Sequence, residues 1–124
     1  MIRVYRSFQI SIGNYCGVAD LSELQNGWFY FNKLSVQKQI RRRRIGSRLL
    51  EQIVIWADTV RVNIYLPINP YGGDDSPGLE DLVTLYERYG FILIEGKEGS
   101  MYRLYTGNNE IPDKDFFDDL FNFN

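Results

Sequence analysis

Histidine is absent from this chain of 124 residues, and cysteine occurs once, at Cys16. The absence of histidine excludes catalytic triads built on imidazole and an imidazole general base. A single cysteine excludes an internal disulfide, and metal centres made of cysteine and histidine are excluded as well, so we expect no metal ion. A reducing cytoplasm is the simplest setting for such a composition.

Long apolar runs are also missing, and the N-terminus lacks the pattern of a signal peptide. We therefore expect no membrane association. A chain of 124 residues is one domain by length and can bury a modest core.

Positive and negative side chains are segregated along the chain, although the formal net charge is only −2. Half of the 14 basic residues lie between Lys33 and Arg48, whereas the segment from Glu110 onward is acidic. Such asymmetry indicates a cationic site on the domain and an acidic appendage. We expect residues 1–106 to form the folded domain and residues 107–124 to form an acidic, phenylalanine-rich C-terminal tail.

Apolar side chains in this tail have helical spacing, and Asp113 is a candidate N-cap. Two interpretations stay open: the helix docks on its own domain, or it binds another chain. The apolar residues are Phe116, Phe117, Leu120 and Phe121.

Alternating and helical patterns predict an α/β (α+β) fold. Turn residues separate the first three strands, which favours an antiparallel meander. A helix then crosses over to the fourth strand, which we expect to run parallel to the third. The result is a mixed, mostly antiparallel sheet of about six strands with one parallel pair, flanked by at least two helices. The predicted strands cover residues 2–12, 15–21, 28–36, 60–66, 91–95 and 101–105, and the predicted helices cover residues 46–59 and 79–89.

A strand end, a basic turn and a helix start follow one another between Leu34 and Leu50. Four arginines, Arg41 to Arg44, make up the turn. Free N–H groups at a helix start, the helix dipole and guanidinium groups all favour an anion at one spot. The pattern predicts a phosphate site, although a nucleic-acid patch or a solvated turn would use the same residues.

This turn resembles the acyl-CoA-binding signature of the Gcn5-related N-acetyltransferases (GNAT), Gln/Arg-x-x-Gly-x-Gly/Ala. Arg41 occupies its first position and Gly46 its last. A second segment, residues 82–91, resembles the family's Leu-Tyr-Glu-x-x-Gly-Phe helix, with Tyr86 at its tyrosine and Gly90 as a C-cap with positive φ. The two motifs stand in the family's order.

Three departures from the family pattern stand out. Arg44 replaces the middle glycine of the signature, and Arg42 stands where a further glycine is common. A helix start needs only αR or β dihedrals, so Arg44 is tolerable there if the turn is not left-handed. The family's N-terminal helices are missing or reduced, so we expect an acceptor site that is shallow, completed by residues 67–78, or supplied by a second subunit in a homodimer.

The resemblance implies transfer of an acetyl group from acetyl-CoA to an amine by direct attack in a ternary complex. It implies that Tyr86 is the general acid for the departing thiolate. The thioester would lie in a gap between the two parallel strands. The implied donor-site residues are Leu34, Ser35, Val36, Arg41, Arg42, Arg43, Arg44, Ile45, Gly46, Ser47 and Asn69.

Other interpretations stay open. Tyr86 can also be interpreted as an aromatic residue that packs in the core from an amphipathic helix, without a catalytic role. No carboxylate lies in residues 28–36, so the general base is open between a water relay and the carboxylates Asp20, Glu23, Asp74 and Asp75. The alternative function is a catalytically degenerate GNAT-fold protein that binds CoA, nucleic acid or a protein partner. The acceptor amine, from a protein or a small molecule, is not identified by the sequence.

Overall fold

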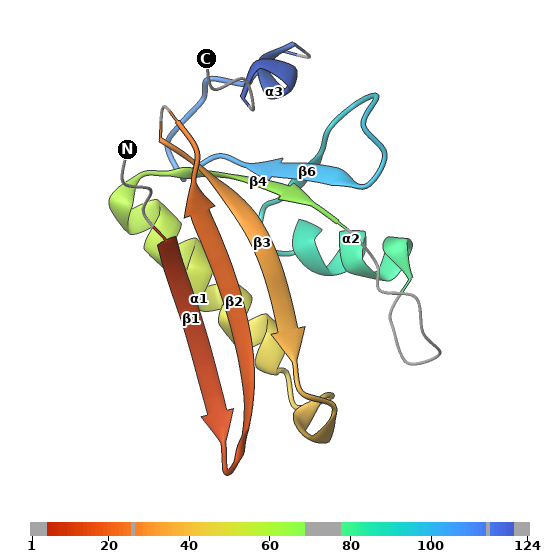
Figure 1. Cartoon of the computed structure of the whole chain (residues 1–124). Helices are drawn as coiled ribbons and strands as arrows, with labels where there is room; N and C mark the ends of the chain where they lie inside the picture. Colours follow the sequence, from red (N-terminus) through yellow and green to blue (C-terminus); the bar gives the residue numbers. More distant parts are fainter. Residues whose placement is uncertain (1–4, 26, 69–77, 114, 121–124) are drawn as a thin grey trace.

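The computed structural model describes residues 5–25, 27–68, 78–113 and 115–120. Within them the chain forms one six-stranded sheet, three α-helices and a short 3₁₀ helix (Figure 1). The strands are β1 (Tyr5–Ile12), β2 (Tyr15–Glu23), β3 (Trp28–Val36), β4 (Asn63–Pro67), β5 (Ile92–Leu93) and β6 (Ser100–Arg103). The helices are α1 (Ile45–Val60), α2 (Leu79–Glu87) and α3 (Phe116–Asp119), and the 3₁₀ helix η1 spans Lys38–Ile40.

The strand order in the sheet is β1-β2-β3-β4-β6-β5. Every neighbouring pair is antiparallel except β3 and β4, which are parallel. α1 forms the crossover between these two strands, as a parallel pair requires. The predicted fold class, a mostly antiparallel mixed sheet with one parallel pair and flanking helices, is confirmed.

Several predicted strand boundaries differ from the structure, most of all at β4 and β5, whereas β3 spans its predicted range. β4 begins at Asn63 because α1 continues to Val60 and Arg61 then ends the helix in a left-handed conformation (φ 60°, ψ 56°). β5 has two residues because the chain turns toward β6 at Ile94, whose carbonyl accepts the N–H of Lys97 at 3.2 Å.

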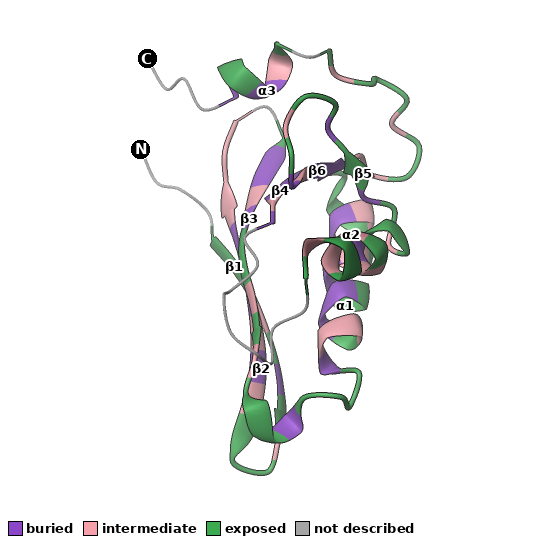
Figure 2. Cartoon of the chain, turned by 90° about the vertical axis from the view of Figure 1, so that its right-hand side faces the viewer, coloured by how far each residue is buried: buried purple, intermediate pink, exposed green. Residues whose placement is uncertain are grey.

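α1 and α2 cover the same face of the sheet (Figure 2). Strand side chains alternate between the two faces, so every second residue points toward these helices. On α1, Leu50, Ile53 and Ala57 share one side of the helix and are fully buried there. The main core is therefore the layer between the sheet and the two helices. Its buried members are Ala19, Leu21, Phe29, Phe31, Leu50, Ile53, Ala57, Ile64, Leu66, Ile68, Tyr86, Phe91 and Met101.

The opposite face of β1, β2 and β3 is polar and is held by contacts between strands. Ser7 Oγ donates to Asp20 Oδ1 at 2.6 Å, and Lys33 Nζ lies 3.5 Å from Asp20 Oδ2. Nearby, Asn32 Nδ2 donates to Ser22 Oγ at 2.6 Å. An antiparallel sheet can pack one face on the core and expose a polar face to solvent, so this part of the sheet needs no covering helix.

Aromatic side chains occupy this same face at its other end, where α3 docks. The buried ring of Phe117 lies 5.7 Å from the ring of Trp28 on β3, 5.9 Å from Tyr65 on β4 and 5.4 Å from Tyr102 on β6. Buried aromatic contacts of this kind each stabilise a docked helix by roughly 0.5–1.5 kcal/mol beyond area burial. The interpretation of the tail as a helix docked on its own domain is confirmed.

The first turn of α3 is stabilised by Asp113. Its Oδ1 accepts the backbone N–H groups of Asp115 at 3.1 Å and Phe116 at 3.0 Å. The Asp113 side chain therefore stabilises the first turn, but the N-cap residue of α3 is Asp115, so the predicted N-cap position is wrong by two residues. Phe121 lies outside the described residues.

None of the helices in the described ranges is long and apolar enough to span a membrane. Across the same residues, aspartate, glutamate and cysteine side chains form no group of three arranged as a metal site. The division of the chain into residues 1–106 and 107–124 stays a prediction.

Candidate functional site

β3 and β4 run side by side over three residue pairs and then separate. Their register ends at Tyr30 opposite Tyr65, although β3 continues to Val36. The pairing of β3 with β2 shifts register just beyond this point, which leaves Asn32 as an extra residue on β3. A bulge of this kind bends a strand, and Figure 1 shows β3 leading away from β4. The edge of β3 beyond Tyr30 therefore borders a gap.

The predicted residues Leu34, Ser35 and Val36 lie along this edge. Leu34 and Val36 are half-buried against the start of α1, whereas Ser35 is exposed. The carbonyl of Val36 accepts a hydrogen bond from Arg41 Nε at 3.0 Å. The structure thus brings the end of β3 and the start of the arginine turn together, as predicted.

Isoleucines at both ends anchor the arginine turn. Ile40 and Ile45 are each 2% exposed and pack with Ile10 and Leu49. β2 approaches the helix start at Gly17, where a Cβ atom would lie only 2.6 Å from Ile45 Cγ2. Because that approach requires glycine, the path of the turn is fixed by packing on the core side.

All four arginines of the turn are exposed. Arg42 and Arg44 have φ angles of 68° and 59°, in the left-handed region. The condition under which Arg44 was expected to be tolerated, a turn that is not left-handed, is therefore not met. These are the two positions where the family pattern favours glycine, and arginine adopts the same conformation here at a cost of about 1–2 kcal/mol each. The guanidinium groups of Arg42, Arg43 and Arg44 make no hydrogen bond or ion pair with the residues that the structure describes.

The N-terminus of α1 is open. The N–H of Arg48 is the first to bond within the helix, to the carbonyl of Arg44 at 3.0 Å, so those of Ile45, Gly46 and Ser47 precede the helical ladder. The first turn has neither an acidic residue nor a side-chain cap. A Cβ atom on Gly46 would meet only Leu34 Cδ2, at 3.9 Å. Donors, dipole and cations therefore converge where an anion would be stabilised.

Tyr86 lies on the core side of the sheet, beside the point where β3 and β4 part. It is 6% exposed, and its ring lies 6.1 Å from Phe31 and 5.7 Å from Phe91. The chain turns sharply after it: Phe91 N–H donates to the Tyr86 carbonyl and Gly90 N–H donates to that of Glu87, at 3.3 and 3.1 Å. With φ of 90° at Gly90, this is a Schellman C-cap, as the motif predicted.

Two groups near the gap were missed from the sequence. Tyr30 and Tyr65 form the last register pair of β3 and β4, with ring centroids 5.8 Å apart on the face opposite α1. Burial and the neighbouring Tyr65 raise the pKa of the Tyr30 hydroxyl. Phe31, which contacts Tyr86, was missed as well. Alternating aromatics predicted only a strand, because no local signal marks where two strands part.

The candidate bases and Asn69 are only partly placed. Asp20 is engaged with Ser7 and Lys33 on the polar face. Glu23 ends β2 opposite Phe29. Asn69, Asp74 and Asp75 lie outside the described residues, so their predicted roles are not tested.

Comparison with known families gives the class of protein. A family profile described as "Acetyltransferase (GNAT) domain" matches residues 5–93, from β1 through β5. This is more than half of the chain, and the protein therefore belongs to the GNAT family. Acetyl transfer is the general activity that this membership supports. No curated protein matches the chain by sequence.

Several solved structures share the fold. The anti-CRISPR protein AcrVA5 has a TM-score of 0.57 and 24% identity, over 77% of this chain and 96% of that one. A GNAT-family acetyltransferase from Staphylococcus aureus Mu50 has a TM-score of 0.53 and 23% identity, over 71% and 58%. The ribosomal-protein-S18-alanine N-acetyltransferase from Escherichia coli has a TM-score of 0.61 and 15% identity, over 88% and 75%. At these identities the likeness shows the fold.

Proposed function

We propose that this protein is an N-acetyltransferase that transfers the acetyl group of acetyl-CoA to an amine by direct attack in a ternary complex. Family membership supports acetyl transfer. The observation that carries the donor assignment is the turn at Arg42 and Arg44, whose backbone keeps the left-handed form favoured by the family's glycines. A strained turn that ends at an open helix start is suited to binding an anion.

The pyrophosphate of the donor fits the arginine turn and the start of α1. The N–H groups of Ile45, Gly46 and Ser47 and the guanidinium groups of Arg41 to Arg44 would hold it. Packing within the described residues does not require glycine at position 46, because a Cβ there has room. Close approach of a phosphate would explain the glycine instead.

The gap beyond Tyr30 is the proposed place for the pantetheine arm. Backbone groups of Leu34, Ser35 and Val36 along the free edge of β3 would hold the arm and polarise the thioester carbonyl. Asn69, which follows β4 in the chain, is proposed to contribute from the other side. Acetyl-CoA, when bound, supplies the thioester whose acyl carbon the amine attacks.

Tyr86 is the proposed general acid. As the amine nitrogen forms its bond to the acyl carbon, the carbon–sulfur bond breaks, and the Tyr86 hydroxyl gives its proton to the departing sulfur. The amine proton leaves to a base or through water. The packing of Tyr86 against Phe31, the residue directly after the last β3–β4 pair, supports this role.

The acceptor site is proposed to be completed by residues 67–78 or by a second subunit. Beside the gap, the face opposite α1 carries polar strand residues, and the described part of the chain places no helix over them. A homodimer predicts twice the 14.6 kDa chain mass by light scattering. A monomer mass would contradict the homodimer, and residues 67–78 would then be the proposed segment that completes the acceptor site. The proposed location is the cytoplasm.

Calorimetric titration with acetyl-CoA, and separately with CoA lacking its 3′-phosphate, tests the donor site. We expect micromolar binding of acetyl-CoA. Absence of binding by both would contradict the proposal and favour the degenerate binding protein.

Tyr86→Phe tests the chemistry. Loss of the acid should lower turnover with an amine acceptor by at least about tenfold, since general acids contribute about 10²–10⁴-fold, and should leave acetyl-CoA affinity nearly unchanged. Tyr89→Phe, a half-buried tyrosine after the same helix, is the matched control and should retain turnover. Equal turnover in wild type and Tyr86→Phe would remove the acid role.

A further inference from the structure

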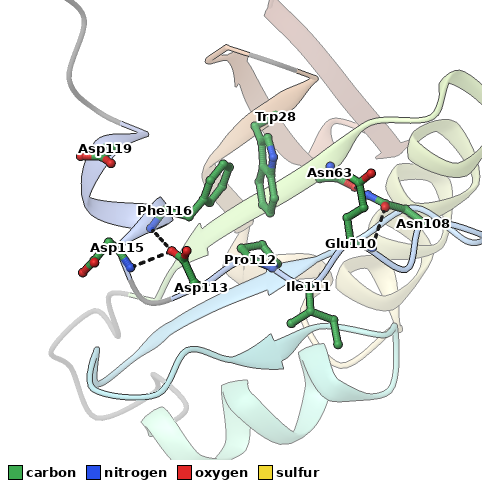
Figure 3. A pocket seen from close by; sticks show the side chains of 10 residues that line it. All are labelled: Trp28, Asn63, Asn108, Glu110, Ile111, Pro112, Asp113, Asp115, Phe116 and Asp119. Carbon is green, nitrogen blue, oxygen red and sulfur yellow. Dashed lines mark hydrogen bonds between the residues drawn. The ribbon is translucent and has the colours of Figure 1, made fainter.

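A cavity lies at the opposite end of β3 and β4 from the gap. It has a volume of about 550 Å³ and lies between the beginnings of these two strands and the C-terminal segment (Figure 3). Trp28 from β3 and Phe116 from α3 form its aromatic wall, with ring centroids 5.1 Å apart. This volume is in the range of small-ligand sites, about 300–1,000 Å³.

The cavity is lined by carboxylates without cationic partners. Glu110, Asp115 and Asp119 line it, and none forms an ion pair with a residue in the described ranges. Asp118, also on α3 but outside the cavity, is paired with Lys97 at 2.5 Å. The unpaired negative charge is therefore concentrated on the cavity side of the segment.

Two largely buried residues at the cavity also carry an N–H donor without an acceptor among the described residues. Asn63 is 7% exposed; its Oδ1 accepts from Tyr105 N and Asn108 Nδ2, whereas its Nδ2 bonds to no described residue. Trp28 is 4% exposed, and its Nε1 likewise has no acceptor. No fully buried side-chain nitrogen among the described residues lacks a partner. Both donors must therefore be accessible, and both residues line this cavity.

These groups select a particular ligand chemistry. The two N–H donors favour an acceptor such as a carbonyl oxygen, which would replace the water that these accessible groups otherwise contact. Carboxylates and aromatic rings together favour a cation. We propose that this cavity binds a basic residue of a peptide chain from another protein, with the peptide carbonyl accepting from Trp28 and Asn63 and the cationic side chain meeting the carboxylates.

The protein's own arginine turn cannot fill the cavity within one chain. The turn follows η1 at one end of the sheet, and α3 lies at the other end (Figure 1). The arginine turn of the same chain is therefore not the cation that we propose for this cavity. This site is separate from the proposed donor site, so it can be tested without acetyl-CoA.

Trp28 provides a direct readout. The chain has two tryptophans, and Trp56→Phe leaves Trp28 as the sole indole. In that background we expect Nα-acetyl-arginine amide to change the indole emission saturably, with binding that weakens as salt rises. The neutral isostere Nα-acetyl-citrulline amide should bind at least about tenfold more weakly. Calorimetry on the unmutated protein gives the same comparison if Trp56→Phe fails to fold.

Paired variants locate the site. Asp115→Asn with Asp119→Asn should weaken binding of Nα-acetyl-arginine amide by about tenfold, as expected for two partly exposed ion pairs. The matched control Asp118→Asn, on the same helix, should change it less than twofold. n-Butylguanidine, which has the same single positive charge but no peptide carbonyl, should bind more weakly than the amide.

Three results would overturn the proposal. They are no saturable signal at millimolar peptide amide in low salt, equal binding of the citrulline compound, and equal loss in Asp118→Asn. n-Butylguanidine binding as tightly as the amide would overturn the role of the two donors.

Discussion

The two ends of α1 are flanked by residues of the same left-handed conformation, but the backbone groups are hydrogen-bonded at one end and open at the other. Arg44 before the helix and Arg61 after it are both left-handed, with φ of 59° and 60°. At the C-terminal end, the N–H groups of Arg61 and Val62 both turn back to the Ala57 carbonyl. At the N-terminal end, the donors stay open and cations surround them. A satisfied end serves the fold, whereas an open end is available to a ligand.

The C-terminal end is also closed by side chains. Arg103 donates from Nη1 and Nη2 to the two carboxylate oxygens of Asp58, at 2.9 and 3.0 Å, and from Nε to the Tyr89 carbonyl at 2.7 Å. Thr106 donates to the same carboxylate from N and Oγ1. Arg103 above all, with help from Thr106, lowers the pKa of Asp58 to about 2. α1, β6 and the α2–β5 turn are thereby joined.

The largest expected effect concerns the open end. Arg42→Ala with Arg43→Ala should weaken acetyl-CoA binding by about tenfold to thirtyfold, because each exposed arginine–phosphate pair contributes at most about 1 kcal/mol and about 1.4 kcal/mol is tenfold. Calorimetric titration at two salt concentrations measures this loss. Arg61→Ala, at the closed end, should leave the affinity unchanged.

An equal loss in Arg61→Ala would break the contrast between the two ends. If the turn serves nucleic acid instead, the double variant will leave acetyl-CoA affinity unchanged and flatten a steep salt dependence of DNA or RNA binding. The absence of nucleic-acid binding at low salt would exclude that alternative.

The second effect concerns the closed end. Asp58→Asn should lower the free energy of unfolding at pH 7 by about 1–2 kcal/mol, a figure reduced for the partial exposure of the carboxylate. Urea unfolding at pH 7 measures it. Asp118→Asn, which breaks the more exposed pair with Lys97, should cost clearly less than Asp58→Asn, because exposed ion pairs contribute little to stability.

The same pair predicts a pH dependence. The folded pKa of Asp58 is about 2, below the ordinary value of 3.8. The ionised carboxylate therefore adds to the free energy of unfolding above the unfolded pKa, and this stabilisation is lost as the pH falls through the folded pKa. The stability difference between wild type and Asp58→Asn should therefore shrink between about pH 4 and pH 2. A difference that stays constant over this range would contradict the role of the ionised carboxylate.

Much of the fold could be predicted because the signals were local. Alternation defined β3, helical spacing defined α1 and α2, and Gly90 marked the turn into β5. The start of β4 could not be predicted, since arginine rather than glycine ends α1 at position 61. Arginine has no preference for the left-handed conformation of a helix C-cap, so Arg61 does not mark the end of α1 in the sequence.

The candidate site was predictable only in its sequence-adjacent parts. The motif located the arginine turn, but the arginine at position 44 suggested the wrong backbone. Packing decides that conformation, through Ile40, Ile45 and the close approach at Gly17. The parting of β3 from β4 depends on the bulge at Asn32. Neither effect is visible in the local sequence, because both depend on strands that are distant in the chain.

The smallest expected effect separates strain from function at the two ends of α1. Arg44→Gly and Arg61→Gly should each raise stability by about 0.5 kcal/mol, because relief of left-handed strain slightly exceeds the entropy that glycine adds to the unfolded chain. Thermal unfolding should show this as a rise of a few degrees in both variants. Only Arg44→Gly should weaken acetyl-CoA binding, since only that arginine lies beside open donors. Equal affinities in both variants would mean that Arg44 contributes backbone shape to the site and no charge.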